Sequence, residues 1–418
     1  MNRPKFSNPF AAPLAALLTV AALLGISGCP LSASSDPSAP PITAQAQEET
    51  GSNVNPQKVL SEGDGYQAIA VVEGLDRPWG VAWLPNGDIL ITERAGRLRI
   101  VRDGQLDPEA IAGVPNVLAQ GQGGLLDIAL HPDFEANGWV YFTYSDGTIR
   151  ENQTQIARAK FDGDRLTDWE VIFKVSQSKN RAQHFGARLL WLPDGTLLAA
   201  IGDGGNPPIR LEGELIRQQA QNLKSHLGKV IRINDDGSIP ADNPFVEDPS
   251  ATPEVWSYGH RNIQGLTLNP LDGAVWATEH GARGGDEVNR VEPGENYGWP
   301  VATHSREYSG GLISPETSLP GMVDPVVIWT PSIAPSGLAV YSGDRFPEWR
   351  GFLFAGALVD QDVRRIELDG SGNVVREVSM PMGQRVRDVR QGPDGFLYVL
   401  TDASDGRLIR LVPMGANQ

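Results

Sequence analysis

A single histidine, His184, stands directly before a segment with the alternating apolar pattern of a β-strand. The strand–turn–strand unit that follows it ends in the run Gly202-Asp203-Gly204-Gly205. Because a hairpin returns the chain to the edge from which it started, we expect Asp203 to lie beside His184. A carboxylate next to an imidazole orients the ring and raises its basicity. The pair is therefore predicted to act as a general base, whereas an isolated histidine would be a structural hydrogen-bonding residue.

A second polar motif, Tyr258-Gly259-His260-Arg261-Asn262, also comes immediately before a predicted strand. A fixed arginine with an adjacent asparagine suits the recognition of an anion or a polarised carbonyl. A salt bridge within the loop is the alternative interpretation of Arg261.

A pair of arginines occurs in the run Arg385-Val386-Arg387-Asp388, before the last predicted hairpin. Strand alternation places Arg385 and Arg387 on one face, where two guanidinium groups can bind the carboxylates of a polyanionic ligand. The formal net charge of the chain is −16. That charge argues against nucleic acid as a partner, since phosphate binding needs clustered lysine and arginine.

The segment from Glu279 to Asn289 is rich in glycine and carboxylates, and it is followed by Asn296-Tyr297-Gly298-Trp299-Pro300. Hard oxygen donors on a bent backbone favour calcium. The spacing is not that of an EF-hand loop, and Gly284-Gly285 is equally consistent with a tight turn alone. His280 has no second histidine or cysteine at zinc spacing, so no zinc site is predicted.

Short alternating apolar runs separated by glycine-containing turns carry these motifs. Glycine supplies the positive φ that such turns need. Six similar hairpins are found at residues 80–92, 129–133 with the residues that follow, 190–200, 268–276, 340–356 and 391–399. The repeat predicts an all-β fold, a six-bladed β-propeller of four-stranded antiparallel blades. A β-sandwich also explains alternating strands, but it does not explain six copies of one hairpin.

The propeller is expected to close on itself, with a strand near Val71 completing the last blade beside Leu408 to Val412. This closure removes exposed sheet edges. The longest insertions lie between Asp203 and Ile233 and between Glu279 and Pro325. Loops at one face of a propeller build its site, so these insertions are expected there.

The N-terminal residues 1–29 are interpreted as a lipoprotein signal peptide: two basic residues, an apolar stretch, and the lipobox Ile26-Ser27-Gly28-Cys29. Cleavage nearby without lipidation is the alternative. Cys29 is the only cysteine, so the mature chain has no internal disulfide and no c-type haem motif. We expect an exported protein, a periplasmic or cell-surface lipoprotein whose only membrane contact is a lipid anchor at Cys29.

Residues 30–62 are rich in Ser, Pro, Ala, Gln and Glu and are expected to form a flexible tether, followed by a catalytic propeller domain at residues 63–416. No later segment is a long uncharged apolar run, which excludes a polytopic membrane protein.

Taken in this order, the motifs resemble those of the soluble PQQ-dependent glucose and aldose sugar dehydrogenases, the glucose/sorbosone dehydrogenase family, and in particular its bacterial aldose sugar dehydrogenase branch. The resemblance covers residues 66–414. Its markers are the segment Gly121 to Leu126 with His131-Pro132-Asp133-Phe134, the His184 segment, Gly259 to Asn262, Asp286-Glu287, Asn296 to Pro300, and Arg385 to Asp388.

The resemblance implies oxidation of aldose sugars at C1 to aldonolactones, with hydride transfer to pyrroloquinoline quinone (PQQ). It implies His184 as the general base, Asp203 as its support, and Arg261 as the group that stabilises negative charge on the quinone oxygen. The implied cofactor-binding residues are Gln122, Asn262, Arg385, Arg387, Trp329 and Ser332.

Calcium is implied as a second cofactor, bound by backbone oxygens of Gly281 and Ala282. Glu287 and Tyr297 match a second, structural calcium site of the family. An external quinone or cytochrome would accept the electrons.

The sequence departs from the family pattern at three positions. Val359 follows Gly356-Ala357-Leu358 where family members commonly have a lysine that contacts PQQ. Gln183 stands where glucose-type members have aspartate, and Ala282 replaces a proline. Two alternatives remain open: a calcium-dependent propeller that hydrolyses lactones, which needs a carboxylate-rich metal centre on the channel axis, and a non-catalytic binding propeller of the same lineage.

Overall fold

The computed structural model describes residues 59–63 and 65–415. The predicted signal peptide, Cys29 and the predicted tether up to residue 58 lie outside the described residues. Within the part of the chain that is described, no helix is both long and apolar enough to cross a bilayer.

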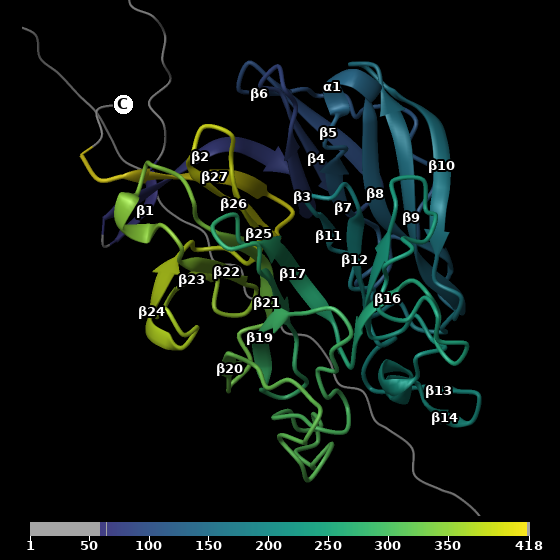
Figure 1. Cartoon of the computed structure of the whole chain (residues 1–418). Coiled ribbons are helices and arrows are strands. Elements are labelled where there is room, and N and C mark those ends of the chain that lie inside the picture. Colours follow the sequence, from purple (N-terminus) through teal and green to yellow (C-terminus); the bar gives the residue numbers. More distant parts are fainter. Residues whose placement is uncertain (1–58, 64, 416–418) are drawn as a thin grey trace, which may run out of the picture. The chain divides into compact units, whose positions relative to one another are not determined.

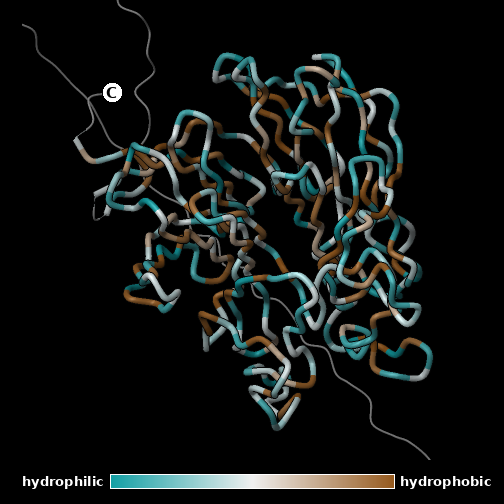
Figure 2. Tube along the Cα trace, viewed as in Figure 1, coloured by the Kyte–Doolittle hydropathy of each residue, from teal (hydrophilic) through white to brown (hydrophobic). Residues whose placement is uncertain are grey.

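The blades form because each carries the same local pattern of strand and turn. In the first blade β3 (Pro78–Trp83) pairs with β4 (Ile89–Glu93), and Gly87 turns the chain between them with φ of 93°. Few residues other than glycine adopt that backbone conformation readily. Figure 2 shows hydrophobic and hydrophilic residues interspersed along the chain, and inner strands such as β4 are apolar and buried over most of their length. Side chains alternate between the two faces of a strand, so an inner strand can bury one row of side chains against each neighbouring blade.

Six antiparallel sheets follow one another along the chain (Figure 1). Blade 1 consists of β3, β4, β5 (Arg97–Arg102) and β6 (Gln105–Leu106), and blade 2 of β7 (Leu125–Leu130), β8 (Trp139–Thr148), β9 (Glu151–Phe161) and β10 (Leu166–Lys174). Blade 3 consists of β11 (Leu189–Trp191), β12 (Leu197–Ile201), β15 (Lys229–Ile233) and β16 (Val255–Tyr258), and blade 4 of β17 (Ile263–Leu268), β18 (Val275–Glu279), β19 (Asp286–Val291) and β20 (Val327–Trp329).

Blade 5 consists of β21 (Pro335–Val340), β22 (Leu353–Ala357), β23 (Asp362–Leu368) and β24 (Val374–Pro381). Blade 6 consists of β25 (Val386–Gln391), β26 (Leu397–Thr401), β27 (Gly406–Pro413), β2 (Tyr66–Leu75) and β1 (Val59–Gly63). The connections contain the small hairpin β13 (Arg210–Leu211) and β14 (Glu214–Leu215), α1 (Phe134–Asn137), and the 3-10 helices η1 (Ile216–Gln221) and η2 (Pro347–Trp349).

The first strands of the six blades contact one another in a closed ring, from β3 through β7, β11, β17, β21 and β25 back to β3. The six-bladed propeller predicted from the sequence is therefore confirmed. Each hairpin recognised in the sequence forms the two innermost strands of a blade. The β-sandwich alternative is wrong, because the sheets surround one axis instead of packing as two layers.

The N-terminal strand closes the ring as predicted. β2 pairs with β27, with Val72 opposite Leu408 and Gln67 opposite Val412. The tether is shorter than predicted, because residues 59–62, expected at its end, belong to strand β1, which pairs with β2. β1 is the outermost strand of its sheet and buries little, so its sequence has no clear alternating apolar pattern.

The hydrophobic core is divided among the interfaces between blades. Six buried clusters each join two neighbouring blades, and the one between blades 6 and 1 contains Val72, Ile91 and Leu400. Because every blade is packed on both faces, the ends of its inner strands are held at fixed positions around the axis. Those ends carry the polar residues described next.

Candidate active site

A cavity of about 390 Å³ lies where the inner hairpins begin and end. Apart from Tyr308, the residues that line it lie shortly before or at the start of the first strand of a blade, or just after the second strand. These lining residues are Trp79, Arg94, Gly121, Gln122, Leu126, Phe185, Gly186, Gln264, His280, Tyr308, Ala334, Leu358, Arg385, Arg387 and Asp402.

The predicted pair of His184 and Asp203 is present beside this cavity. His184 Nδ1 lies 2.6 Å from Asp203 Oδ1, and both side chains are buried. The backbone of His184 has φ of 46°, in the left-handed region, and its N–H donates to Gln122 Oε1 at 2.7 Å. Since Asp203 accepts the proton on Nδ1, the opposite ring nitrogen, Nε2, is left as an acceptor.

Burial and the surrounding charges favour a neutral imidazole and an ionised carboxylate. Burial lowers the pKa of His184, and the nearby Arg261 lowers it further, while Asp203 acts in the opposite direction. Burial raises the pKa of Asp203, but His184, Arg261 and the N–H of Gly205 outweigh burial and leave that pKa below its usual value. A neutral imidazole with a free Nε2 is the form that can accept a proton.

Arg261 and Asn262 carry buried donor atoms that have no partner. Arg261 NH1 donates to His280 O at 2.9 Å, and the Arg261 backbone N–H makes a short hydrogen bond to Glu279. Its Nε and NH2 atoms, and Nδ2 of Asn262, have no hydrogen-bond partner among the described residues. Unpaired buried donors are costly, so a site that holds three of them beside a cavity suits a ligand rich in acceptors.

The two arginines predicted to lie on one face do so, and both line the cavity. Each contacts the same carboxylate: Arg385 NH2 and Arg387 NH2 lie 3.1 and 2.9 Å from Asp402 Oδ2. Arg387 NH1 also donates to Gln264 Oε1 at 3.2 Å. With Arg94, three arginines but only one carboxylate line the cavity, so its wall favours an anionic ligand.

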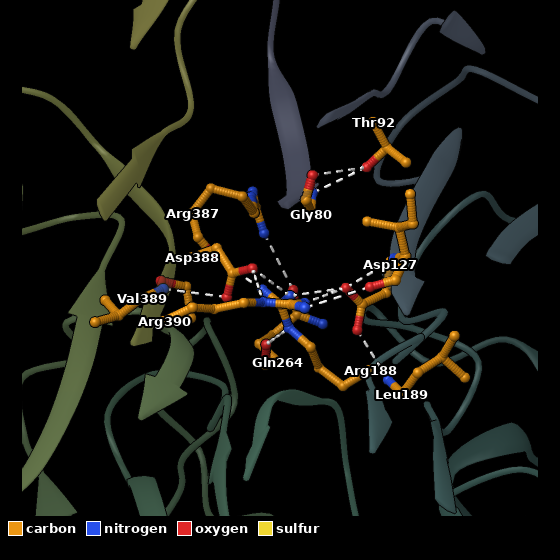
Figure 3. A network of polar contacts seen from close by, with 12 residues as sticks. Gly80, Thr92, Asp127, Arg188, Leu189, Gln264, Arg387, Asp388, Val389 and Arg390 are labelled. Carbon is orange, nitrogen blue, oxygen red and sulfur yellow. Dashed lines mark hydrogen bonds and ion pairs between the residues drawn. The ribbon is translucent and has the colours of Figure 1, made fainter. Parts of the chain in front are cut away.

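A buried ion network lies behind the arginine wall, as Figure 3 shows. Arg188 NH1 binds Asp127 and Asp388, and its NH2 and Nε donate to the backbone carbonyls of Arg387 and Gln264 at 3.1 and 2.6 Å. One guanidinium group from the segment before blade 3 thereby fixes the backbone of cavity residues in blades 4 and 6.

The loop that follows β18 contains the predicted calcium ligands. A Cβ atom at Gly281 would lie 2.3 Å from Gly284 O, so only glycine fits there. Gly284 and Gly285 both have positive φ and form the tight turn considered above. The described residues contain no group of three or more His, Cys, Asp or Glu arranged to hold a metal ion. A cation in this loop would therefore depend on backbone carbonyls.

Glu287 and Tyr297, the predicted ligands of a second calcium ion, differ in the oxygen atoms that they could provide to a cation. Burial raises the pKa of Glu287 to about 8, and the carboxylates of Glu279, Asp286 and Asp324 add to this effect. The Tyr297 hydroxyl already donates to a backbone carbonyl and accepts a backbone N–H. Only the backbone carbonyl of Tyr297 is thus available for a cation.

Three of the predicted cofactor residues, Asn262, Trp329 and Ser332, are not among the residues that line the cavity, and the side chains of the last two are held by other blade residues. Trp329 packs into the core between blades 4 and 5, and its Nε1 donates to Glu377 Oε1 at 3.0 Å. Ser332 donates to Asp286 Oδ2 at 2.6 Å. Both side chains face blade residues, and Ala334 from the same segment lines the cavity in their place.

Sequence reasoning missed Arg94, His280 and Asp402 as cavity residues. Each follows directly after the second strand of its blade, β4, β18 and β26 respectively. Asp203 occupies a similar position after β12. Alignment of the six hairpins on one another, a signal already in the sequence, would have identified these positions.

Val359, where the family lysine is absent, is 56% exposed and follows Leu358 of the cavity wall.

The chain is similar in sequence to a known family and to a named bacterial enzyme. Residues 75–410 match the family model described as glucose / sorbosone dehydrogenase. The chain is 42% identical over 349 residues to the aldose sugar dehydrogenase YliI of Escherichia coli, covering 81% of this chain and 91% of that one.

Two solved structures are similar throughout. The apo-form of the soluble aldose sugar dehydrogenase of Escherichia coli superposes with a TM-score of 0.78 at 40% identity, covering 83% of this chain and 99% of that one. The PQQ-bound form of an aldose sugar dehydrogenase of Streptomyces coelicolor gives a TM-score of 0.67 at 29% identity, covering 85% of this chain and 97% of that one.

Proposed function

The chain belongs to the glucose/sorbosone dehydrogenase family, and from this premise we propose that it oxidises aldose sugars at C1 to aldonolactones with PQQ and Ca²⁺. The observation that carries the proposal is the contact between His184 and Asp203 at the edge of an arginine-lined cavity. A neutral base and a cationic wall are the two features that this oxidation requires of the protein.

The cavity wall has the chemistry to hold PQQ, which is a flat tricarboxylate. Arg385 and Arg387 would bind its carboxylates, and Gln122 and Asn262 would donate to its ring oxygens. The unpartnered Nε and NH2 of Arg261 would face the quinone end of the molecule. When bound, PQQ accepts the hydride that leaves C1 of the sugar.

The protein contributes the proton transfer. His184 Nε2 would accept the proton of the C1 hydroxyl, and Asp203 would stabilise the imidazolium that results. Arg261 is buried and its charge is fixed in place, so it would stabilise negative charge at the quinone oxygen without reorganisation.

Calcium would bind through the carbonyl oxygens of Gly281 and Ala282, because the described residues supply no carboxylate cluster there. A bound divalent cation would polarise the quinone carbonyl as a Lewis acid. The partly buried carboxyl of Glu287, surrounded by other carboxylates, supports the second cation site together with the Tyr297 carbonyl.

The electrons would leave through an external quinone or cytochrome, since the sequence has no motif for a c-type haem. The lipobox supports export and attachment to a membrane surface through Cys29.

The proposal is tested by adding PQQ and CaCl₂ to the purified protein and following quinone absorbance and dye reduction with a panel of aldoses. We expect the absorbance of bound PQQ to change when an aldose is added. The variant His184→Gln should still bind PQQ but turn over about 10²- to 10⁴-fold more slowly, the usual contribution of a positioned general base. Absence of PQQ binding by the wild-type protein would refute the proposal, and full activity of the variant would refute only the role of His184.

A further inference from the structure

The carboxylate of Asp203 is held at both of its oxygen atoms. Oδ1 contacts His184 Nδ1 and accepts the N–H of Gly205 at 3.0 Å. Oδ2 accepts a hydrogen bond from the indole Nε1 of Trp299 at 2.8 Å. Rotation about the Cβ–Cγ bond would turn the carboxylate plane away from the imidazole, so a second contact on Oδ2 restrains that plane and keeps the other oxygen on Nδ1.

Trp299 is itself fixed by contacts along its length. The side chain is buried, its backbone N–H donates to Gly259 O at 2.9 Å, and its carbonyl accepts from Gln221 Nε2 at 2.8 Å. The Arg261 guanidinium lies 5.2 Å from the centre of its ring, within the range of a cation–π contact. The indole thus touches both charged residues that flank His184.

The contact joins two insertions that are far apart in sequence. Asp203 begins the insertion between β12 and β15, and Trp299 lies in the insertion between β19 and β20. The loops of blades 3 and 4 therefore meet at His184 through this N–H···O bond, in addition to the contact between Gln221 and the Trp299 carbonyl. Loop residues reach a precise geometry only when such contacts fix them.

We propose that Trp299 is a positioning residue of the His184–Asp203 pair. By holding Oδ2, the indole N–H keeps Oδ1 on His184 Nδ1, which fixes the imidazole as the tautomer with its proton on Nδ1 and its acceptor on Nε2. The catalytic consequence rests on the proposed function, because it matters only if His184 is the base. The effect on the tautomer can be measured without cofactor.

Trp276 in blade 4 provides a matched control for Trp299. Trp276 of β18 is equally buried, but its indole N–H has no hydrogen-bond partner among the described residues. The variants Trp299→Phe and Trp276→Phe remove the same atoms from a buried ring. Only the first removes a hydrogen bond to a carboxylate.

The experiment records ¹⁵N chemical shifts of the histidine rings in the cofactor-free protein, with the His184 signals assigned by their loss in His184→Gln. We expect the wild-type imidazole to be protonated on Nδ1, and Trp299→Phe to show a mixture of tautomers. In protein loaded with PQQ and Ca²⁺, kcat should fall about tenfold in Trp299→Phe, the typical effect of one hydrogen bond to a charged group. KM and PQQ affinity should change less than twofold, and Trp276→Phe should behave as wild type.

Unchanged His184 shifts in Trp299→Phe, or equal changes in Trp276→Phe, would overturn the proposal. If Trp299→Phe does not fold, the indole N–H signals of the wild-type and Asp203→Asn proteins decide the question. An upfield shift of one tryptophan N–H in Asp203→Asn supports the contact, and unchanged indole signals refute it. A wild-type protein that binds no PQQ would refute the proposed function but leave these cofactor-free measurements valid.

Discussion

Arg387 NH2 lies 2.9 Å from Asp402 Oδ2 at the wall of the cavity, and both side chains are more than 90% buried. Arg385 reaches the same oxygen from the surface side. Asp402 thereby holds the two arginines together, and it occupies donors that an anionic ligand would otherwise use.

Replacing Asp402 by asparagine should have opposite effects on folding and on binding. The free energy of unfolding of the cofactor-free protein should fall by about 3 kcal/mol, because buried Arg387 loses its charged partner. Affinity for PQQ should rise by about tenfold, since both guanidinium groups gain free donors. Chemical denaturation and a fluorescence titration with PQQ measure the two effects. Asp405→Asn, which changes an exposed carboxylate nearby, should alter neither, and weaker PQQ binding by Asp402→Asn would contradict the argument.

Introducing a lysine at Val359 should strengthen PQQ binding modestly. Val359 is exposed and follows Leu358 of the cavity wall, so a lysine there adds a cation close to a site that already favours anions. An exposed ion pair contributes at most about 1 kcal/mol, so the Kd should fall by about fivefold or less. Titration at low and high salt tests this, because screening should remove the gain. Val375→Lys adds the same charge on the exposed strand β24 and should leave the Kd unchanged.

Lys179 should make stability depend on pH in the alkaline range. Its side chain is buried, and Nζ donates to Asn152 Oδ1 at 3.0 Å. Burial lowers the pKa of Lys179 to about 7, while Asp203 acts in the opposite direction. Between pH 7 and about 10.4, the usual lysine value, the unfolded chain binds more protons than the native chain, so the free energy of unfolding should rise with pH.

The variant Lys179→Met should lose this contribution, which amounts to a slope of at most about 1.4 kcal/mol per pH unit. Denaturation curves at pH 7, 8, 9 and 10 give the difference in slope between the variant and the wild type. Lys174→Met, at an exposed position on β10, serves as the control. Parallel pH profiles for Lys179→Met and the wild type would show that Lys179 stays charged when buried.

Removing Glu287 should act on stability more than on cofactor binding. When the free Ca²⁺ concentration is a hundred times the Kd of the site, binding adds about 2.7 kcal/mol to the free energy of unfolding. A chelator should therefore lower the Tm of the wild type but not that of Glu287→Ala, while the Kd for PQQ changes little. Glu292→Ala removes an exposed glutamate from the same segment and should retain the chelator effect. A wild-type Tm that is insensitive to chelator would rule out a structural calcium ion at Glu287.

The sequence alone determined the repeated hairpin of this protein, and with it the number of blades and the contacts between residues that flank one hairpin. Each hairpin has its own turn and alternation, so six copies predicted six blades. The neighbourhood of His184 and Asp203 was predictable because both flank one hairpin. The common face of Arg385 and Arg387 follows from the alternation of side chains along a strand.

Only the tertiary structure decided which residues of different blades meet. Trp299 reaches Asp203, Arg188 reaches the carbonyls of Gln264 and Arg387, and Trp329 turns into the core instead of the cavity. These contacts join two insertions, cross the central channel or lie between neighbouring blades, and no period in the sequence links the residues that make them. Their geometry depends on how the blades pack around the axis, a long-range property that the local pattern of strands and turns does not contain.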